Sequence, residues 1–230
     1  MERYQRQTIL EEFGETRQQQ LQASSVLIIG LGGLGSPVAS YLVSSGIGHI
    51  GLCDNDIVSI TNLQRQILYT EQDLGKSKVT CAYNRLQAMS STAVFDIYDK
   101  GITPDTALDI IPDYDIVVDC TDNFAARLII DEVCAQLGKP WVHGSIDGFY
   151  GTITVFNHNY RKRYIDLYPD AKILAEENES ILGTLGPIPG IIGSMQALET
   201  IKVLTDCGDV LDGRLLLLSL DSMLFQIVEF

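Results

Sequence analysis

The chain has 230 residues, enough for one α/β domain with a full hydrophobic core. Hydrophobic residues make up 46% and charged residues 20%, a balance that excludes wholesale disorder. The net charge of −14 repels phosphate backbones and anionic lipids, so we expect neither a nucleic-acid nor a membrane partner. Because the N-terminal region lacks an apolar signal core, and no apolar run is long enough to span a bilayer, we expect a cytoplasmic protein.

Strand-like and helix-like segments alternate over the first two thirds of the chain. In chain order they are a strand at 24–30, a helix at 36–46, a strand at 49–56, a helix at 75–89, strands at 93–99 and 114–123, a helix at 124–138 and a strand at 140–146. This alternation predicts an α/β protein with a Rossmann-like, doubly wound and mostly parallel sheet. Ligands of such sheets bind beyond the carboxyl ends of the strands.

The pattern changes after about residue 147. An antiparallel strand is predicted at 151–157, an irregular polar stretch at 158–185, a long helix at 189–205 and a hairpin over 213–230. We therefore expect one domain over 1–230, with a Rossmann-like core at 1–147 and a C-terminal lobe at 148–230. The lobe extends the same sheet with antiparallel strands, and residues 158–185 form a crossover loop.

A glycine-rich turn lies between the first predicted strand and the first predicted helix. This turn has a Gly-x-Gly-x-x-Gly pattern, and its glycines are Gly30, Gly32, Gly33 and Gly35. Glycines there let the backbone approach a phosphate, and the helix N-terminus offers free N–H groups. The alternative is a tight turn needed only for packing. The glycines by themselves do not distinguish NAD(H) from ATP.

Acidic side chains follow the strands that should share one edge of the sheet. Asp54 stands where a carboxylate accepts hydrogen bonds from ribose hydroxyls, although it also fits a turn. Asp54 or Asp56, together with Asp122, offers the carboxylate oxygens that Mg²⁺ prefers.

Cationic side chains favour ATP over a dinucleotide. Arg65 and Gln66 lie just downstream of the second strand, and Lys76 and Lys78 open the next helix. A triphosphate needs positive charge over its β and γ groups, because pyrophosphate leaves with charge to be neutralised. A dinucleotide needs fewer cationic side chains.

The five cysteines argue against a disulfide framework or a cysteine-rich zinc site. Their number is odd and no two are spaced Cys-x-x-Cys. Cys53, Cys120 and Cys134 lie in apolar stretches, so we expect buried thiols.

Seven stretches occur in an order that resembles one family. They are RYQRQ (3–7), GLGGLGS (30–36), DNDIVSITNLQRQ (54–66), GKSK (75–78), DCTDN (119–123), GTITVF (151–156) and GSMQALETIK (193–202). Over nearly its whole length the chain resembles the MoeB/ThiF/HesA family, bacterial relatives of ubiquitin-activating enzymes. The resemblance implies use of ATP and Mg²⁺ to adenylate the C-terminal glycine of a small ubiquitin-like sulfur carrier ending in Gly-Gly, such as ThiS or MoaD, with release of pyrophosphate.

The resemblance also implies roles for individual residues. It places the phosphates against Gly32 and its neighbours Gly30 and Gly33, the ribose on Asp54 and the Mg²⁺ on Asp122. The phosphates are contacted by Asn62, Arg65 and Lys78, and the same nucleotide site includes Asp56 and Gln66. Arg6 resembles an arginine that reaches into the partner subunit's site, which implies a homodimer. The expected catalytic set is Arg6, Arg65, Lys78 and Asp122.

Two departures from the family pattern bear on zinc and on covalent chemistry. The stretch at 157–171 holds no Cys-x-x-Cys pair and the given sequence ends at Phe230, so we expect no structural zinc. The crossover loop has no cysteine near Glu179, and its neighbour Ser180 is a poor nucleophile. We expect adenylation without a covalent cysteine step there.

Two alternatives stay open. One is a non-catalytic or repurposed family member, a scaffold or an activator of another peptide carboxylate. The other is an NAD-dependent oxidoreductase, which is disfavoured because no proton-transfer pair is evident and His143 fits a packed histidine better. Among carriers, analogy with short relatives without zinc favours thiamine over molybdopterin synthesis.

Overall fold

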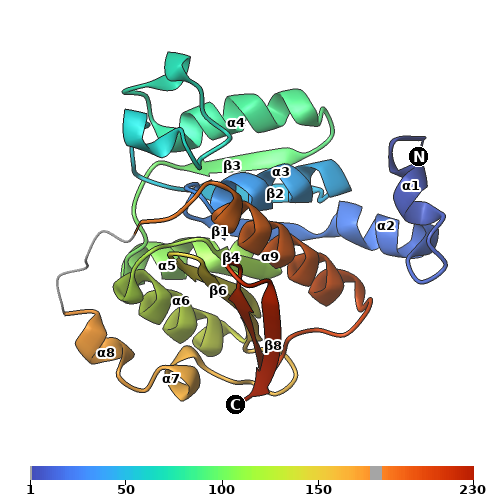
Figure 1. Cartoon of the computed structure of the whole chain (residues 1–230). Helices are drawn as coiled ribbons and strands as arrows, with labels where there is room; N and C mark the ends of the chain where they lie inside the picture. The colour runs from blue at the N-terminus through green and yellow to red at the C-terminus, as the bar shows by residue number, and fades with distance from the viewer. Residues whose placement is uncertain (1, 177–182) are drawn as a thin grey trace.

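The computed structural model describes residues 2–176 and 183–230, and these build an eight-stranded sheet in the order β3-β2-β1-β4-β5-β6-β7-β8 (Figure 1). The strands are β1 Ser25–Ile29, β2 His49–Cys53, β3 Val94–Tyr98, β4 Ile116–Asp119, β5 Trp141–Asp147, β6 Tyr150–Phe156, β7 Arg214–Ser219 and β8 Leu224–Glu229. Strands β1 to β5 are parallel, and β6, β7 and β8 each add antiparallel to the preceding strand. The predicted α/β class, with a parallel core and antiparallel C-terminal strands, is confirmed.

Helices cover both faces of the sheet. They are α1 Gln5–Thr8, α2 Gly14–Ala23, α3 Gly35–Ser45, α4 Lys78–Met89, α5 Pro104–Ile110, α6 Phe124–Leu137, α7 Tyr164–Leu167, α8 Ala171–Leu174 and α9 Pro187–Thr205. One hydrophobic core joins α3, α4 and α9 to the sheet, and a second core joins α5 to α8 to the opposite face. Strand β1 is apolar after Ser25, as expected for a strand covered on both sides: Val26, Leu27 and Ile28 are fully buried.

The order of the strands fixes where a ligand site can form. From β1 the chain runs outward through β2 to β3, and then returns to the other side of β1 as β4. The backbone ladder continues just past the strands: Gly30 N donates to Cys53 O at 2.8 Å, and Cys120 N donates to Ile29 O at 2.8 Å. The segments that follow β1, β2 and β4 therefore lie side by side at the switch point of the sheet.

Several predicted boundaries were too long, and the reasons are local. Strand β4 was expected to reach residue 123 but ends at Asp119, whose Oδ1 accepts the N–H of Thr121 at 3.0 Å and turns the chain. The helix predicted at 75–89 begins only at Lys78, after the N-cap Ser77. Lys76 consequently precedes the helix.

Some helices were not predicted. In α2 only Gln18 and Leu21 are buried, so this polar segment shows no amphipathic pattern. Helix α5 carried recognisable signals, the N-cap Thr103 followed by Pro104 at the first position. The stretch 158–185 was expected to be irregular, but the short helices α7 and α8 lie within it. Among the described residues, no helix combines the length and apolarity needed to cross a bilayer.

Candidate nucleotide-binding site

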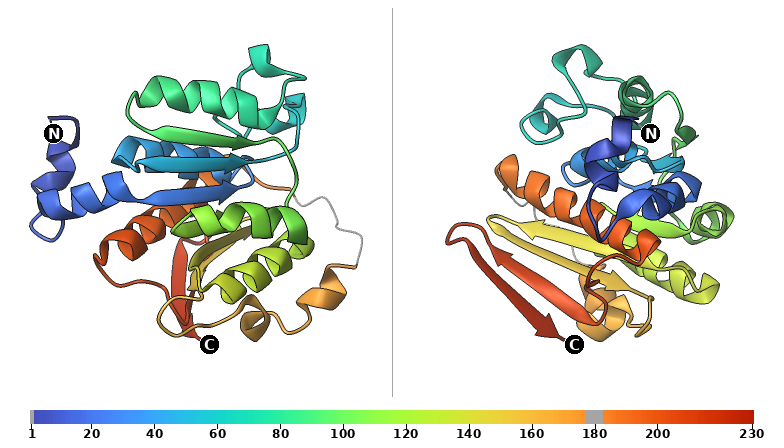
Figure 2. Two further views of the ribbon diagram at one scale, coloured as in Figure 1. Left: turned by 180° about the vertical axis from the view of Figure 1, so that it is seen from behind. Right: turned by 90° about the vertical axis from the view of Figure 1, so that its right-hand side faces the viewer.

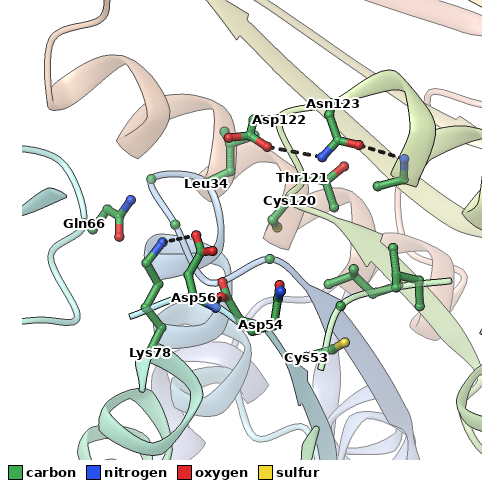
Figure 3. Close-up of a pocket in the computed structure, with 18 of the residues that line it drawn as sticks. Leu34, Cys53, Asp54, Asp56, Gln66, Lys78, Cys120, Thr121, Asp122 and Asn123 are labelled. Carbon is green, nitrogen blue, oxygen red and sulfur yellow. Dashed lines mark hydrogen bonds and ion pairs between the residues drawn. The ribbon is translucent and has the colours of Figure 1, made fainter. Parts of the chain in front are cut away.

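A cavity of about 630 Å³ opens at the carboxyl edge of the sheet, beside the glycine turn (Figure 3). Its size is in the range of small-molecule pockets. Segments from distant parts of the sequence meet there. Of the predicted site residues, those that line it are Gly30, Gly32, Gly33, Asp54, Asp56, Arg65, Gln66, Lys78 and Asp122.

The glycines of the turn serve two different purposes. Gly30 has φ +90°, and a Cβ there would lie 2.6 Å from Cys120 O; a Cβ on Gly35 would overlap Gly30 O. Packing alone therefore requires these two glycines. A Cβ on Gly32 would only touch Gln66 Nε2 at 3.4 Å, an ordinary contact. The tight-turn alternative does not account for Gly32, which borders the cavity.

Asp54 ties the glycine turn to the end of β2. One of its carboxylate oxygens accepts the N–H of Leu31 at 2.7 Å, and the other accepts the N–H of Asp56 at 2.8 Å. Burial raises the pKa of Asp54, against the two backbone hydrogen bonds that lower it. Each oxygen keeps a second lone pair, so the side chain can also accept from a hydroxyl group.

Lys78 and Asp56 form an ion pair at the cavity wall (Figure 3). Nζ of Lys78 lies 2.8 Å from Oδ2 of Asp56, and the lysine side chain is only 6% exposed, against 65% for the aspartate. Lys76 is not part of this wall. It is exposed and lies 3.8 Å from Asp73.

Two side chains of the NLQRQ stretch, Arg65 and Gln66, line the cavity, and a third, Asn62, stabilises the turn of the stretch itself. Arg65 lines the cavity, and its Nη1 donates to Thr61 O at 3.0 Å. Gln66 is buried beside Gly32, and its Oε1 has no hydrogen-bond partner in the described part of the chain. Asn62 does not line the cavity; its Oδ1 accepts the N–H of Ser59 at 2.9 Å and shapes the turn before Arg65.

Asp122 is exposed on the turn after β4 and faces the cavity from the side opposite Lys78 (Figure 3). Its Oδ1 is 3.4 Å from Nδ2 of Asn123, and Asn123 in turn caps α6 by accepting the N–H of Ala126 at 2.8 Å. The Asp122 carboxylate thus has coordination capacity left; Asp54 already accepts two backbone N–H groups, and Asp56 is paired with Lys78. Within residues 2–176 and 183–230, no three His, Cys, Asp or Glu side chains gather as a metal site.

His143 is buried beneath this turn, as expected for a packed histidine. It is 0% exposed, and its Nδ1 lies 2.8 Å from Oδ2 of Asp119. Burial lowers the pKa of His143, against the hydrogen bond to Asp119. A histidine without solvent access or contact with the cavity cannot exchange protons with a substrate there. The oxidoreductase alternative thereby loses its candidate proton donor.

Arg6 lies far from the cavity of its own chain. It is an exposed residue of α1. Figure 2 shows this helix, next to the N-terminus, at the edge where the parallel strands begin, whereas the residues that line the cavity follow the carboxyl ends of those strands. Any contact between Arg6 and such a cavity would therefore need a second copy of the chain.

Lys100 is a cavity residue that sequence reasoning missed. It lies just after β3, and the rule about carboxyl ends that singled out Asp54 applies equally to it. Ile102, Ala126 and Ile129 add an apolar section to the wall. No sequence pattern marks these three as site residues.

The cysteines are free. Cys53, Cys120 and Cys134 are buried, as predicted, and burial raises the pKa of each of these thiols. Glu179 and Ser180, the position of the missing family cysteine, lie outside the described residues.

Fold and cavity together define a doubly wound α/β protein with a polar, glycine-bordered cavity at its topological switch point. The model of the ThiF family matches residues 4–230, and the chain belongs to this family. It is 44% identical over 220 residues to "Adenylyltransferase and sulfurtransferase MOCS3" of Culex quinquefasciatus, covering 94% of this chain and 49% of that protein. With the protein of that name from Arabidopsis thaliana, identity is 42% over 228 residues, covering 99% and 49%. The chain spans about half the length of these curated relatives.

Solved structures share the fold. Escherichia coli MccB, crystallised with ATP, superposes with a TM-score of 0.86 at 24% identity, covering all of this chain and 71% of that one. PaaA superposes with a TM-score of 0.83 at 24% identity, covering 99% and 72%.

Proposed function

We propose that this protein is an ATP-dependent adenylyltransferase that activates the C-terminal glycine carboxylate of a small ubiquitin-like sulfur carrier. The observation that carries the proposal is the cavity itself. Arg65 and Lys78, implied to contact the phosphates, and Asp122, implied to hold Mg²⁺, come from separate segments and line the same cavity beside the glycine turn. The relatives named as adenylyltransferases, at 42–44% identity, support this activity.

The charges of the cavity suit a nucleotide that brings its own cation. Among the described lining residues, the carboxylates of Asp54, Asp56 and Asp122 are balanced by Arg65, Lys78 and Lys100. A triphosphate therefore arrives with negative charge that these residues leave uncompensated. Bound Mg²⁺ would supply divalent positive charge on the phosphate oxygens. Asp122 would hold it, because its carboxylate is exposed and, in the described part of the chain, accepts only the 3.4 Å hydrogen bond from Asn123.

The proposed reaction is the transfer of the adenylyl group of ATP to the carrier's carboxylate, which gives an acyl-adenylate. A carboxylate oxygen of the carrier attacks the α-phosphorus, the bond to the β-phosphate oxygen breaks, and pyrophosphate leaves with the electron pair. Lys78 and Arg65 neutralise charge on the phosphates, and the glycine turn allows the backbone N–H groups to approach them. Asp54 orients the ribose. These residues act by positioning and by charge, not by covalent catalysis.

The proposal includes a homodimer and a cytoplasmic location. Arg6 lies too far from its own cavity, so it would act as Arg6 of the partner subunit and add positive charge over the phosphates. The carrier ends in Gly-Gly, with a thiamine-pathway carrier favoured over a molybdopterin one.

The test is ATP–pyrophosphate exchange with purified carriers that end in Gly-Gly. We expect exchange that depends on a carrier and is lost in Asp122→Ala. Asp113→Ala is a matched control, because Asp113 is exposed and lies before β4, at the other end of that strand. Tight ATP binding without exchange for any carrier would instead favour the non-catalytic alternative. NAD bound to the purified protein would refute the proposal.

A further inference from the structure

The turn that carries Asp122 rests on a buried carboxylate three residues earlier. Asp119, the last residue of β4, has 0% exposure. Its Oδ1 accepts two hydrogen bonds from Thr121, from the backbone N at 3.0 Å and from Oγ1 at 2.6 Å. Both bonds fix the chain direction immediately before Asp122.

The other oxygen of Asp119 is held from two further elements. His143 on β5 brings Nδ1 to 2.8 Å from Oδ2, and Arg127 on α6 brings Nε to 3.6 Å. Burial raises the pKa of Asp119, but the hydrogen bond from His143 and the charge of Arg127 outweigh it and hold that pKa below its ordinary value. The group is therefore a carboxylate at neutral pH.

Arg127 also binds the turn directly. Its Nη2 donates to Thr121 O at 2.9 Å, and its guanidinium lies 5.7 Å from the centre of the Phe124 ring. From a fourth element, Gln196 on α9 donates to Asp119 O at 2.6 Å. Strands β4 and β5 and helices α6 and α9 thus converge on one residue.

Burying this charged network in the core is energetically unfavourable. Taking a carboxylate and a guanidinium out of water carries a large desolvation cost, and well-packed apolar residues often replace such pairs without loss of stability. What an apolar replacement could not do is bind the N–H, hydroxyl and carbonyl groups of Thr121. The network therefore determines the geometry of the turn, which apolar packing could not do.

We propose that Asp119, held by His143 and Arg127, is a positioning residue that aims Asp122 at the Mg²⁺–phosphate group of the bound nucleotide. The inference rests on the proposed function, because it needs a nucleotide in the cavity. It concerns how Asp122 is placed, and it assigns His143 a role in that placement in spite of its distance from solvent.

The experiment measures binding of a non-hydrolysable ATP analogue by calorimetry, once with Mg²⁺ and once with EDTA. The ratio of the two affinities is the gain from Mg²⁺. We compare the unaltered protein with Asp119→Asn, Asp122→Asn and the control Asp131→Asn. Asp131 is a buried aspartate on α6 that likewise pairs with an arginine, Arg163, and accepts a backbone N–H, but it does not line the cavity.

Asp119→Asn should reduce the gain from Mg²⁺ about tenfold, close to the loss in Asp122→Asn, because outer residues that orient a metal ligand have effects of that size. Affinity in EDTA should stay within about twofold, and Asp131→Asn should keep the full gain. If Asp119→Asn does not fold by circular dichroism, His143→Gln serves instead. It leaves the bonds to Thr121 in place, and it should lose a smaller part of the gain.

Two results would overturn the inference and leave the proposed function standing. One is a full gain from Mg²⁺ in both Asp119→Asn and His143→Gln. The other is an equal loss in the control Asp131→Asn, which would show that any buried aspartate matters. If the unaltered protein binds the analogue no better with Mg²⁺, the proposed function and this inference fall together.

Discussion

Lys78 pairs with Asp56 across 22 residues of sequence, with Nζ 2.8 Å from Oδ2, so this lysine of the cavity has a counter-ion of its own. The lysine is nearly buried and the aspartate is mostly exposed. A phosphate that binds Lys78 must therefore compete with a carboxylate. This competition makes the pair the most direct place to test the cavity.

Lys78→Ala should weaken ATP binding by about tenfold to a hundredfold, because it removes a cation and leaves Asp56 facing the phosphates unpaired. The double variant Lys78→Ala with Asp56→Asn should recover part of that loss. Calorimetric titration with ATP–Mg²⁺ measures both. If the double variant binds no better than Lys78→Ala, Asp56 does not act as a competing counter-ion.

Gly32→Ala should fold normally and bind nucleotide at least about tenfold more weakly. The added Cβ meets only the end of the Gln66 side chain, so the free energy of unfolding should change by no more than about 0.5 kcal/mol. The same methyl group stands where the backbone must approach phosphate. Gly35→Ala is the contrasting variant, because its Cβ would overlap Gly30 O and should lower the melting temperature. Unchanged nucleotide affinity in Gly32→Ala would place the phosphates elsewhere.

Arg6→Ala and Asp122→Ala should each lose exchange activity, and mixing the two should restore part of it. In a homodimer with shared sites, random reassortment leaves about a quarter of the sites with neither change. Refolding the two variants together and measuring ATP–pyrophosphate exchange tests this. A mixture as inactive as its components, in which heterodimers are demonstrated, would argue against a shared site.

Acid should destabilise this protein partly through His143. Its pKa in the folded protein is lowered by burial, so below about pH 6.5, the ordinary histidine value, the unfolded chain binds the proton first. Stability is therefore lost as pH falls. The lowered pKa of Asp119 also makes the folded protein less stable as pH falls, but only below about pH 3.9, the ordinary aspartate value.

Melting temperatures of the unaltered protein and His143→Gln between pH 7.5 and 5.5 test this sign. The fall on acidification should be smaller in His143→Gln. The other two histidines are present in both proteins, so their effect cancels. Parallel curves would show that His143 does not couple folding to protons.

Much of the site could be predicted because it follows from one topological rule. Gly30, Asp54 and Asp122 each follow a parallel strand, and parallel strands end at one edge. Lys100 obeys the same rule and was overlooked. Arg127 could not have been found in this way, since a single arginine in a predicted helix looks like a surface charge until packing shows which way it points.

The sequence by itself determined the class of the fold and the chemistry gathered at the sheet edge. Periodicity and glycine spacing are local properties of the chain, and they sufficed for the parallel core, the turn and most of its charged neighbours. Only the tertiary structure decided which charged side chains are paired or buried and which are exposed to the cavity. Lys78 is paired with Asp56, and Asp119 and His143 are buried beneath the turn, whereas Asp122 is exposed and accepts only a 3.4 Å hydrogen bond from Asn123 among the described residues. The physical reason is that this pairing and burial depend on contacts between residues far apart in the sequence, 22 positions for Lys78 and Asp56 and 24 for Asp119 and His143, which no local pattern encodes.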